Sequence, residues 1–137
     1  MNMIFKDNNH ENAFYQILDK MQLTHTDTER TALAYLLALN EDCRKHISDL
    51  YDFDERIILV EGLDKAWQTH TSLKTTRMAF NLYNGYCYDN KIYIGSDGYE
   101  RDLPSEHYSP IHLFACNDAP YYWEAIKLRY PEYTEED

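Results

Sequence analysis

The chain has 137 residues and a formal net charge of −11, because 24 aspartates and glutamates outnumber 13 lysines and arginines. This length favours one domain, and 44% hydrophobic with 27% charged residues is a globular composition rather than a disordered one. The acidic balance excludes general binding to nucleic-acid phosphates, since that binding depends on Lys and Arg displacing counterions. It disfavours adsorption to anionic membranes for the same reason.

The N-terminal residues and the cysteines favour a cytoplasmic protein. The first seven residues contain no basic stretch followed by an apolar region, so they do not resemble a secretory signal. The longest uncharged apolar run, Ala32 to Leu39, is too short to span a bilayer. Cys43, Cys87 and Cys116 are odd in number and widely spaced, which fits reduced thiols better than a disulfide framework.

The first 84 residues contain only one glycine and no proline, and their apolar spacing predicts helices. The first is expected from about 9 to 22. The second follows a capping-box pattern in which Thr26 is the N-cap and Glu29 lies three residues later; it is apolar most of the way round, which predicts a central position. A short third helix should follow residues 40–42. Residues 56–60 are either a strand or a buried extended segment, and a further helix should begin at Thr71 or Ser72 and end near 84.

From residue 85 onward glycines and all four prolines break the pattern. Residues 91–99 predict a small β-hairpin, because Gly and Asp-Gly supply the positive φ that such turns need. Ser109 and Pro110 predict a helix start. A last helix should begin near 117–120, place Trp123, Ile126 and Tyr130 on one face, and stop at Pro131. The sequence therefore predicts a mainly α (α+β) fold: one compact domain over 1–131 with five to six helices, followed by a frayed acidic end over 132–137.

The charge is unevenly distributed. Residues 65–88 contain no acidic residue and carry +3, which leaves −14 on the other 113 residues. Hydroxyls and bases gather there at a predicted helix N-terminus, where free N–H groups and the helix dipole favour an anion. The candidate anion-binding residues are Trp67, Gln68, Thr69, His70, Thr71, Ser72, Lys74 and Arg77. The alternative is an ordinary capped helix whose bases pair with the surrounding acidic surface.

Metal and enzyme chemistry receive weaker support. Cys43 with His46 and His112 with Cys116 have helical i,i+3 and i,i+4 spacing that could hold zinc, but buried cysteine more often acts as a small hydrophobe. No motif supplies a nucleophile with its base, and the carboxylates of residues 51–55 are more typical of a solvated turn. We therefore expect no cofactor, and an enzymatic activity is less favoured than a binding function.

Ten of the 13 tyrosines lie from residue 83 onward. Tyrosine suits surfaces where the ring is buried in a contact and the hydroxyl stays wet, and it is enriched at interface hot spots. The predicted protein-interface residues are Tyr86, Tyr88, Tyr93, Tyr99, Tyr108, Glu100 and Asp102. The alternative, expected for about half of the tyrosines, is closure of a small core beneath this segment. An acidic, tyrosine-rich surface fits a basic protein partner.

Four stretches resemble a family of small uncharacterised proteins from Gram-positive bacteria, their phages and mobile elements. They are residues 40–42 with 51–53, 67–69, 79–85, and 108–114 with 124–133, within a similarity that spans about 26–133. The resemblance carries over no catalytic residue. It implies a cytoplasmic accessory protein and directs attention to the polar residues of these stretches, which are Trp67, Gln68, Thr69, Asn81, Asn84 and Arg129.

Together these patterns favour a non-enzymatic inhibitor that binds a basic, nucleic-acid-handling host or defence protein, such as a CRISPR effector. The alternative is a protein that binds a small ligand or nucleotide at residues 67–77 and sequesters or hydrolyses it.

Overall fold

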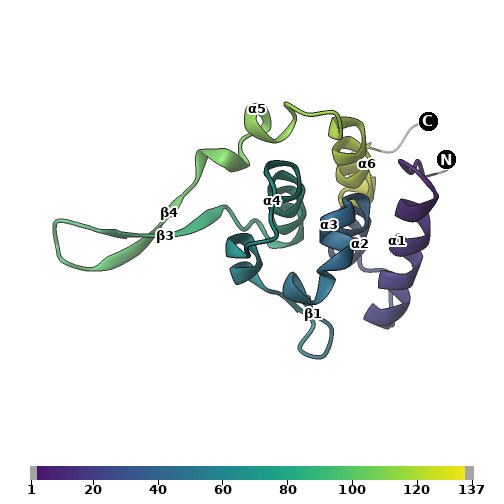
Figure 1. Cartoon of the computed structure of the whole chain (residues 1–137), viewed down its shortest axis with the longest axis horizontal. Helices are drawn as coiled ribbons and strands as arrows, with labels where there is room; N and C mark the ends of the chain where they lie inside the picture. The colour runs from purple at the N-terminus through teal and green to yellow at the C-terminus, as the bar shows by residue number, and fades with distance from the viewer. Residues whose placement is uncertain (1–2, 135–137) are drawn as a thin grey trace.

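The computed structural model describes residues 3–134, apart from the side chains of residues 90–93. It shows the mainly helical fold that the sequence predicts, with two small antiparallel strand pairs where one hairpin was predicted (Figure 1). The longer helices are α1 (Asn8–Met21), α2 (Thr28–Leu39), α4 (His70–Asn84) and α6 (Ala119–Arg129). Shorter helices are α3 (Glu41–Lys45), α5 (Pro110–Leu113) and α7 (Pro131–Thr134), with 3-10 turns η1 (Ile47–Asp49), η2 (Val60–Asp64) and η3 (Glu106–Tyr108). The strands are β1 (Tyr51–Asp52), β2 (Ile57–Ile58), β3 (Tyr88–Ile94) and β4 (Glu100–Pro104).

Helix α2 is the centre of the core. Its residues from Ala32 to Leu39 are at most 2% exposed, and α1, α4 and α6 all pack against it. A helix that is apolar on every side must be buried on every side, so the central position predicted for this segment is confirmed. No helix within residues 3–134 combines the length and the apolar character needed to cross a membrane.

A buried histidine fixes the N-terminal segment to this core. Asp7 caps α1 and accepts a hydrogen bond from the backbone N–H of His10 (2.8 Å). The backbone N–H of Lys6 donates to His10 Nδ1 (3.1 Å), so Nε2 carries the proton and donates to the Tyr35 carbonyl (2.9 Å). Burial lowers the pKa of His10, which is consistent with this neutral tautomer.

Two helices begin at other residues than the sequence predicts. Helix α2 is capped by Asp27, whose carboxylate accepts from the backbone N–H of Arg30 (2.9 Å), so the prediction of Thr26 as N-cap is wrong. Helix α4 is capped by Thr69 rather than beginning at Thr71 or Ser72. In both cases neighbouring residues can all serve as caps, and only the approach of the preceding chain decides which one does.

The last long helix buries Tyr122 and Ala125 and leaves Trp123 of the predicted apolar face exposed. Trp123 is 53% exposed, whereas Tyr122 and Ala125 are fully buried. Tyr122 points inward because its hydroxyl pairs with Thr75 of α4 (2.8 Å) and its ring packs edge-on against Phe114. Helix α6 ends before Pro131, as predicted, and Pro131 begins α7; residues 135–137 of the predicted frayed end lie outside the described residues.

Candidate functional site

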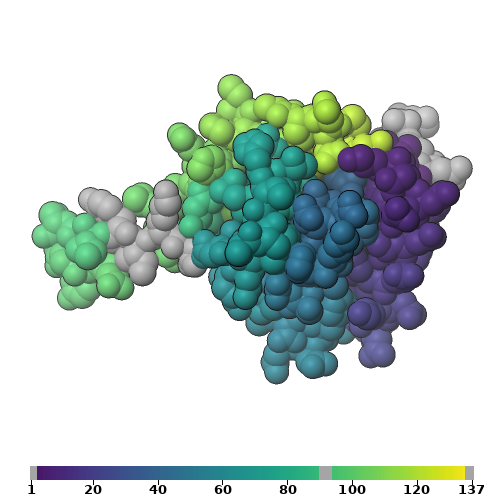
Figure 2. Space-filling model, viewed as in Figure 1, coloured from purple at the N-terminus to yellow at the C-terminus, as the bar shows by residue number. Residues whose placement is uncertain are grey.

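The most prominent surface feature is the hairpin formed by β3 and β4, which extends away from the helical body as an arm (Figures 1 and 2). Ile94 pairs with Glu100, and the turn between them is closed by hydrogen bonds from Gly95 N to the Tyr99 carbonyl (3.1 Å) and from Gly98 N to the Gly95 carbonyl (2.9 Å). Gly98 has φ +82°, a conformation that side-chain-bearing residues rarely adopt. The hairpin predicted for 91–99 is therefore present, and it is longer at both ends.

The arm exposes apolar side chains. Ile94 is 64% exposed, Tyr99 70% and Leu103 52%, and every residue of β4 is exposed. An isolated exposed leucine is ordinary, but three large apolar side chains on one projecting element are typical of a binding surface. The helical body buries most of its large apolar residues in one continuous core, and its exposed ones, such as Ile111 and Trp123, are spread over separate elements.

The arm's charges leave its acidic residues available. Both guanidinium nitrogens of Arg101 bond the Asp97 carboxylate inside the turn, which neutralises this arginine locally. Glu100 and Asp102 are exposed, and neither forms an ion pair with another described residue. The accessible charge of β4 is therefore negative.

Asp89 anchors the arm to the body. Its carboxylate accepts from Arg77 Nε of α4 (3.0 Å) and contacts His107 Nδ1 (2.6 Å), and the Ser105 hydroxyl also donates to it. Burial raises the pKa of Asp89, but the hydrogen bonds from Ser105 and His107 and the charge of Arg77 outweigh burial, so the pKa lies below its ordinary value. One carboxylate thus connects α4 with both ends of the hairpin.

Aromatic rings support the arm from below. Tyr86 packs edge-on against Phe80, Tyr88 and Tyr108, and the Tyr108 hydroxyl donates to the Tyr88 carbonyl (2.8 Å). Tyr108 is only 8% exposed, and burial raises the pKa of its hydroxyl. Of the predicted interface tyrosines, Tyr86, Tyr88 and Tyr108 therefore lie at the base of the arm and Tyr99 at its tip, whereas the side chain of Tyr93 lies outside the described residues.

Many polar side chains of the predicted anion-binding segment are hydrogen-bonded within the protein. Trp67 stacks on His46 (4.5 Å between ring centroids) and donates through Nε1 to Asp49 (2.9 Å). Thr69 and Ser72 form a reciprocal capping box, and the Ser72 hydroxyl donates to Gln68 Oε1 (2.6 Å). These contacts place the segment as a capped helix start.

The two cations of that segment are also engaged. Lys74 Nζ donates to the Ala115 carbonyl (3.1 Å) and Arg77 pairs with Asp89, while His70 and Thr71 are exposed at the first turn of α4. The other polar residues of the familiar stretches close helix ends: Asn81 and Asn84 bond the backbone of Tyr86, and Arg129 donates to the Leu82 carbonyl (2.8 Å). The contacts favour the capped-helix interpretation over an anion site.

The two cysteine–histidine pairs do not converge. Cys43 is buried against Thr76 (3.4 Å), and burial raises the pKa of its thiol to about 12. His46 lies on Trp67, His112 bonds Ser109 (2.8 Å), and Cys116 donates to the Leu113 carbonyl (3.5 Å). Within residues 3–134, no group of three or more His, Cys, Asp or Glu is arranged to hold a metal ion.

The sequence reasoning missed Ile94, Leu103, Asp89, Ser105 and His107. Leu103 follows three charged residues in the sequence, which was an available signal for its exposure. The contacts of Asp89, however, join residues 12 to 18 positions apart and depend on the path of the hairpin.

The fold and the site define a small helical protein that carries a projecting, acidic hairpin. The chain belongs to a family of unknown function (DUF6075), whose model matches residues 1–137. No curated protein and no solved structure matches it.

Proposed function

We propose that this protein acts by binding another protein through the hairpin arm. The observation that carries the proposal is the exposure of Ile94, Tyr99 and Leu103 on an element held away from the body. Burying these side chains in a partner would remove apolar area from water at about 25 cal/mol per Å². Tyr99 is the expected hot spot, since tyrosine contributes a large rigid ring with a polar end.

The charge of the arm and of the whole chain favours a basic partner. Glu100 and Asp102 flank the apolar side chains on β4, and the net charge of −11 attracts a cationic surface at long range. Such complementarity accelerates association and makes it sensitive to salt. A partner that offers an apolar groove rimmed by Lys and Arg would match both features.

The proposal extends to inhibition of a nucleic-acid-handling host or defence protein, for example a CRISPR effector blocked by a phage or mobile-element protein. Carboxylates of the arm that pair with Lys and Arg of the partner would occupy the cations that otherwise bind phosphates. The arm would then compete with nucleic acid for the same surface. The cytoplasm, where such partners act, is the expected location.

A pull-down from a lysate of the encoding organism tests the proposal, with captured proteins identified by mass spectrometry. Tyr99→Ala and Leu103→Ala should each weaken the purified complex about tenfold, or about 1.4 kcal/mol. Ile111→Ala is the matched control, because Ile111 is 78% exposed on α5 rather than on the arm, and it should bind like the wild type.

The electrostatic part has its own test. The double variant Glu100→Gln/Asp102→Asn should slow association and flatten its salt dependence, whereas Asp54→Asn/Glu55→Gln, which removes two exposed carboxylates in the β1–β2 turn, should change neither. Nucleic acid added to the complex should displace the protein. Equal binding by the arm variants and the wild type would contradict the proposal.

A further inference from the structure

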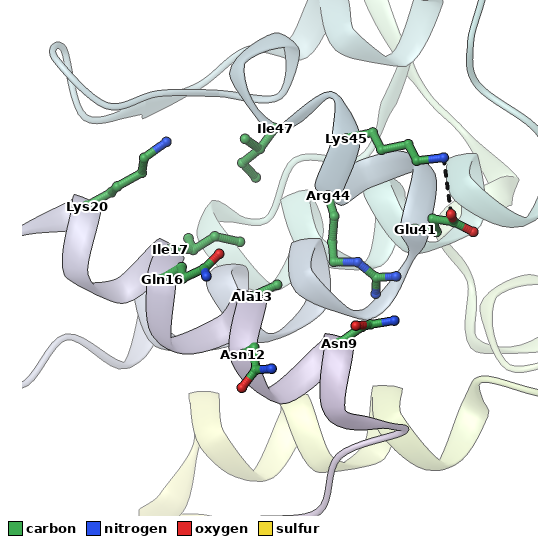
Figure 3. A pocket seen from close by; sticks show the side chains of 10 residues that line it. All are labelled: Asn9, Asn12, Ala13, Gln16, Ile17, Lys20, Glu41, Arg44, Lys45 and Ile47. Atoms are coloured by element: carbon green, nitrogen blue, oxygen red, sulfur yellow. Dashed lines mark ion pairs between the residues drawn. The ribbon is translucent and has the colours of Figure 1, made fainter.

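A second surface, unrelated to the arm, is a groove of about 550 Å³ between α1 and the α3–η1 segment (Figure 3). Helix α1 lies at the opposite end of the molecule from the hairpin in Figure 1. The spacing of Asn9, Asn12, Gln16 and Lys20 places them on one face of α1, because residues three and four apart are neighbours on a helix. A volume of this size lies within the range of sites for small ligands.

Three of the residues that line this groove are cationic. Lys20, Arg44 and Lys45 line it with Glu41 as its one acidic lining residue, in a protein whose acidic residues outnumber its basic ones. Lys45 pairs with Glu41 (3.1 Å), and Lys20 lies over the ring of Phe53 (5.4 Å) at the far end. The groove therefore keeps a net positive charge.

Hydrogen bonds from one guanidinium nitrogen hold Arg44 in position and leave its other nitrogens able to bind a ligand. Its Nη1 donates to the carbonyls of Ala38 (2.9 Å) and Leu39 (3.3 Å) at the end of α2. Among the residues that the structure describes, neither Nε nor Nη2 of Arg44 has a hydrogen-bond partner. A guanidinium fixed on one side and open on the other suits a phosphate, which accepts two parallel hydrogen bonds.

The middle of the groove is apolar with amides at its edge. Ile17 and Ile47 both line it, and Gln16 lies beside Ile17 (Figure 3). Ile17 is only 6% exposed and belongs to the core, whereas Ile47 is half-buried. The Ile47 side chain can therefore cover one face of a flat ring, and a carboxamide offers both a donor and an acceptor to the edge of a base. Along the groove, Arg44 lies at one end, Ile17 and Ile47 lie in the middle, and Lys20 lies at the other end (Figure 3).

We propose that this groove binds a nucleoside monophosphate, with the phosphate on Arg44, the base against Ile47, and the base edge on Gln16. The phosphate contacts the cationic end and the base covers the apolar middle. This site is distinct from residues 67–77, whose cations are engaged elsewhere, and it does not depend on the hairpin's function.

An NMR titration of the ¹⁵N-labelled full chain with AMP, GMP, CMP and UMP at low salt tests the proposal. At least one nucleotide should cause saturable shifts of amides within residues 9–20 and 41–47, with adenosine and inorganic phosphate as separate probes of its two halves. Arg44→Gln should weaken binding at least tenfold. Because Arg44 also bonds the end of α2, Gln16→Glu is the second variant: it changes an exposed side chain, places a carboxylate beside the nucleotide, and should also weaken binding at least tenfold.

Lys74→Gln is the matched control, since it removes a cation outside the groove and should leave affinity within twofold of the wild type. Three outcomes would overturn the proposal: no saturable shift with any of the four nucleotides at about 1 mM, shifts confined to residues 67–77, or inorganic phosphate binding as tightly as the nucleotides.

Discussion

Asp89 shows how one residue can decide the position of an element. Its carboxylate receives bonds from Arg77 on α4 and from Ser105 and His107 after β4. We expect Asp89→Asn to lower the free energy of unfolding by about 2 kcal/mol at pH 7, since hydrogen bonds to a charged group contribute about 1.5–3 kcal/mol. Urea denaturation measures this change.

The same substitution gives a pH prediction. A carboxylate whose pKa is lowered on folding stabilises the protein above its unfolded pKa, here near 3.8, and loses that contribution as the pH falls through the folded value. The stability difference between wild type and Asp89→Asn should therefore shrink as the pH falls below about 4. A difference that persists undiminished at the lowest pH at which both proteins fold would contradict the role of the charge.

At this scale the sequence indicates residue types but not partners. Arg77 was a candidate for contact with a ligand anion, and in the structure it pairs with Asp89, 12 positions away in the same chain. Nothing in the spacing distinguishes a carboxylate of the chain itself from one of a ligand, because the pairing depends on where β3 leaves α4. Local pairs such as Asp7 with His10 are predictable in kind, since capping contacts span three residues.

At the scale of elements, Thr69 separates a helix cap from an anion site. Its hydroxyl accepts from the Ser72 backbone N–H (3.1 Å), and Ser72 returns the bond to the Thr69 N–H (2.7 Å). Thr69→Ala should destabilise the protein by about 1 kcal/mol in thermal or urea unfolding. Thr71→Ala, at an exposed position in the same turn, is the control and should change stability by less than about 0.5 kcal/mol.

Helices were predictable here as elements, but their ends and faces were less so. The apolar run of α2 determines both its existence and its central place. The predicted apolar face of α6 includes Trp123, but the buried ring of this helix is Tyr122, because Thr75 offers its hydroxyl a partner. Periodicity is based on apolar residues alone, so it cannot identify an aromatic ring whose hydroxyl has a hydrogen-bond partner inside the core.

At the scale of the whole molecule, the sequence predicted the hairpin of the arm but not its projection from the helical body. Gly95 and Gly98 predict a turn, and the strands follow from it. That the hairpin projects, rather than lying on α4 as a cover, depends on the tertiary anchor at Asp89 and on the tyrosines beneath it. The uneven charge of the chain also has a different meaning in three dimensions. In the basic segment 65–88, Lys74 and Arg77 are bound to other parts of the chain, whereas Lys20 and Arg44 line a separate groove.

Because the arm stands clear of the body, stability and binding should separate. The core cluster contains no described residue between 87 and 107, so replacing residues 90–102 with an Asn-Gly turn keeps both the core and the Asp89 anchor. We expect the free energy of unfolding to change by less than about 1 kcal/mol, because a two-stranded hairpin contributes little by itself, while partner capture in the pull-down is lost. Calorimetry measures the first and the pull-down the second. A shortened protein that still captures the partner would move the binding surface to the helical body, and one that no longer folds would show that the arm stabilises the core it projects from.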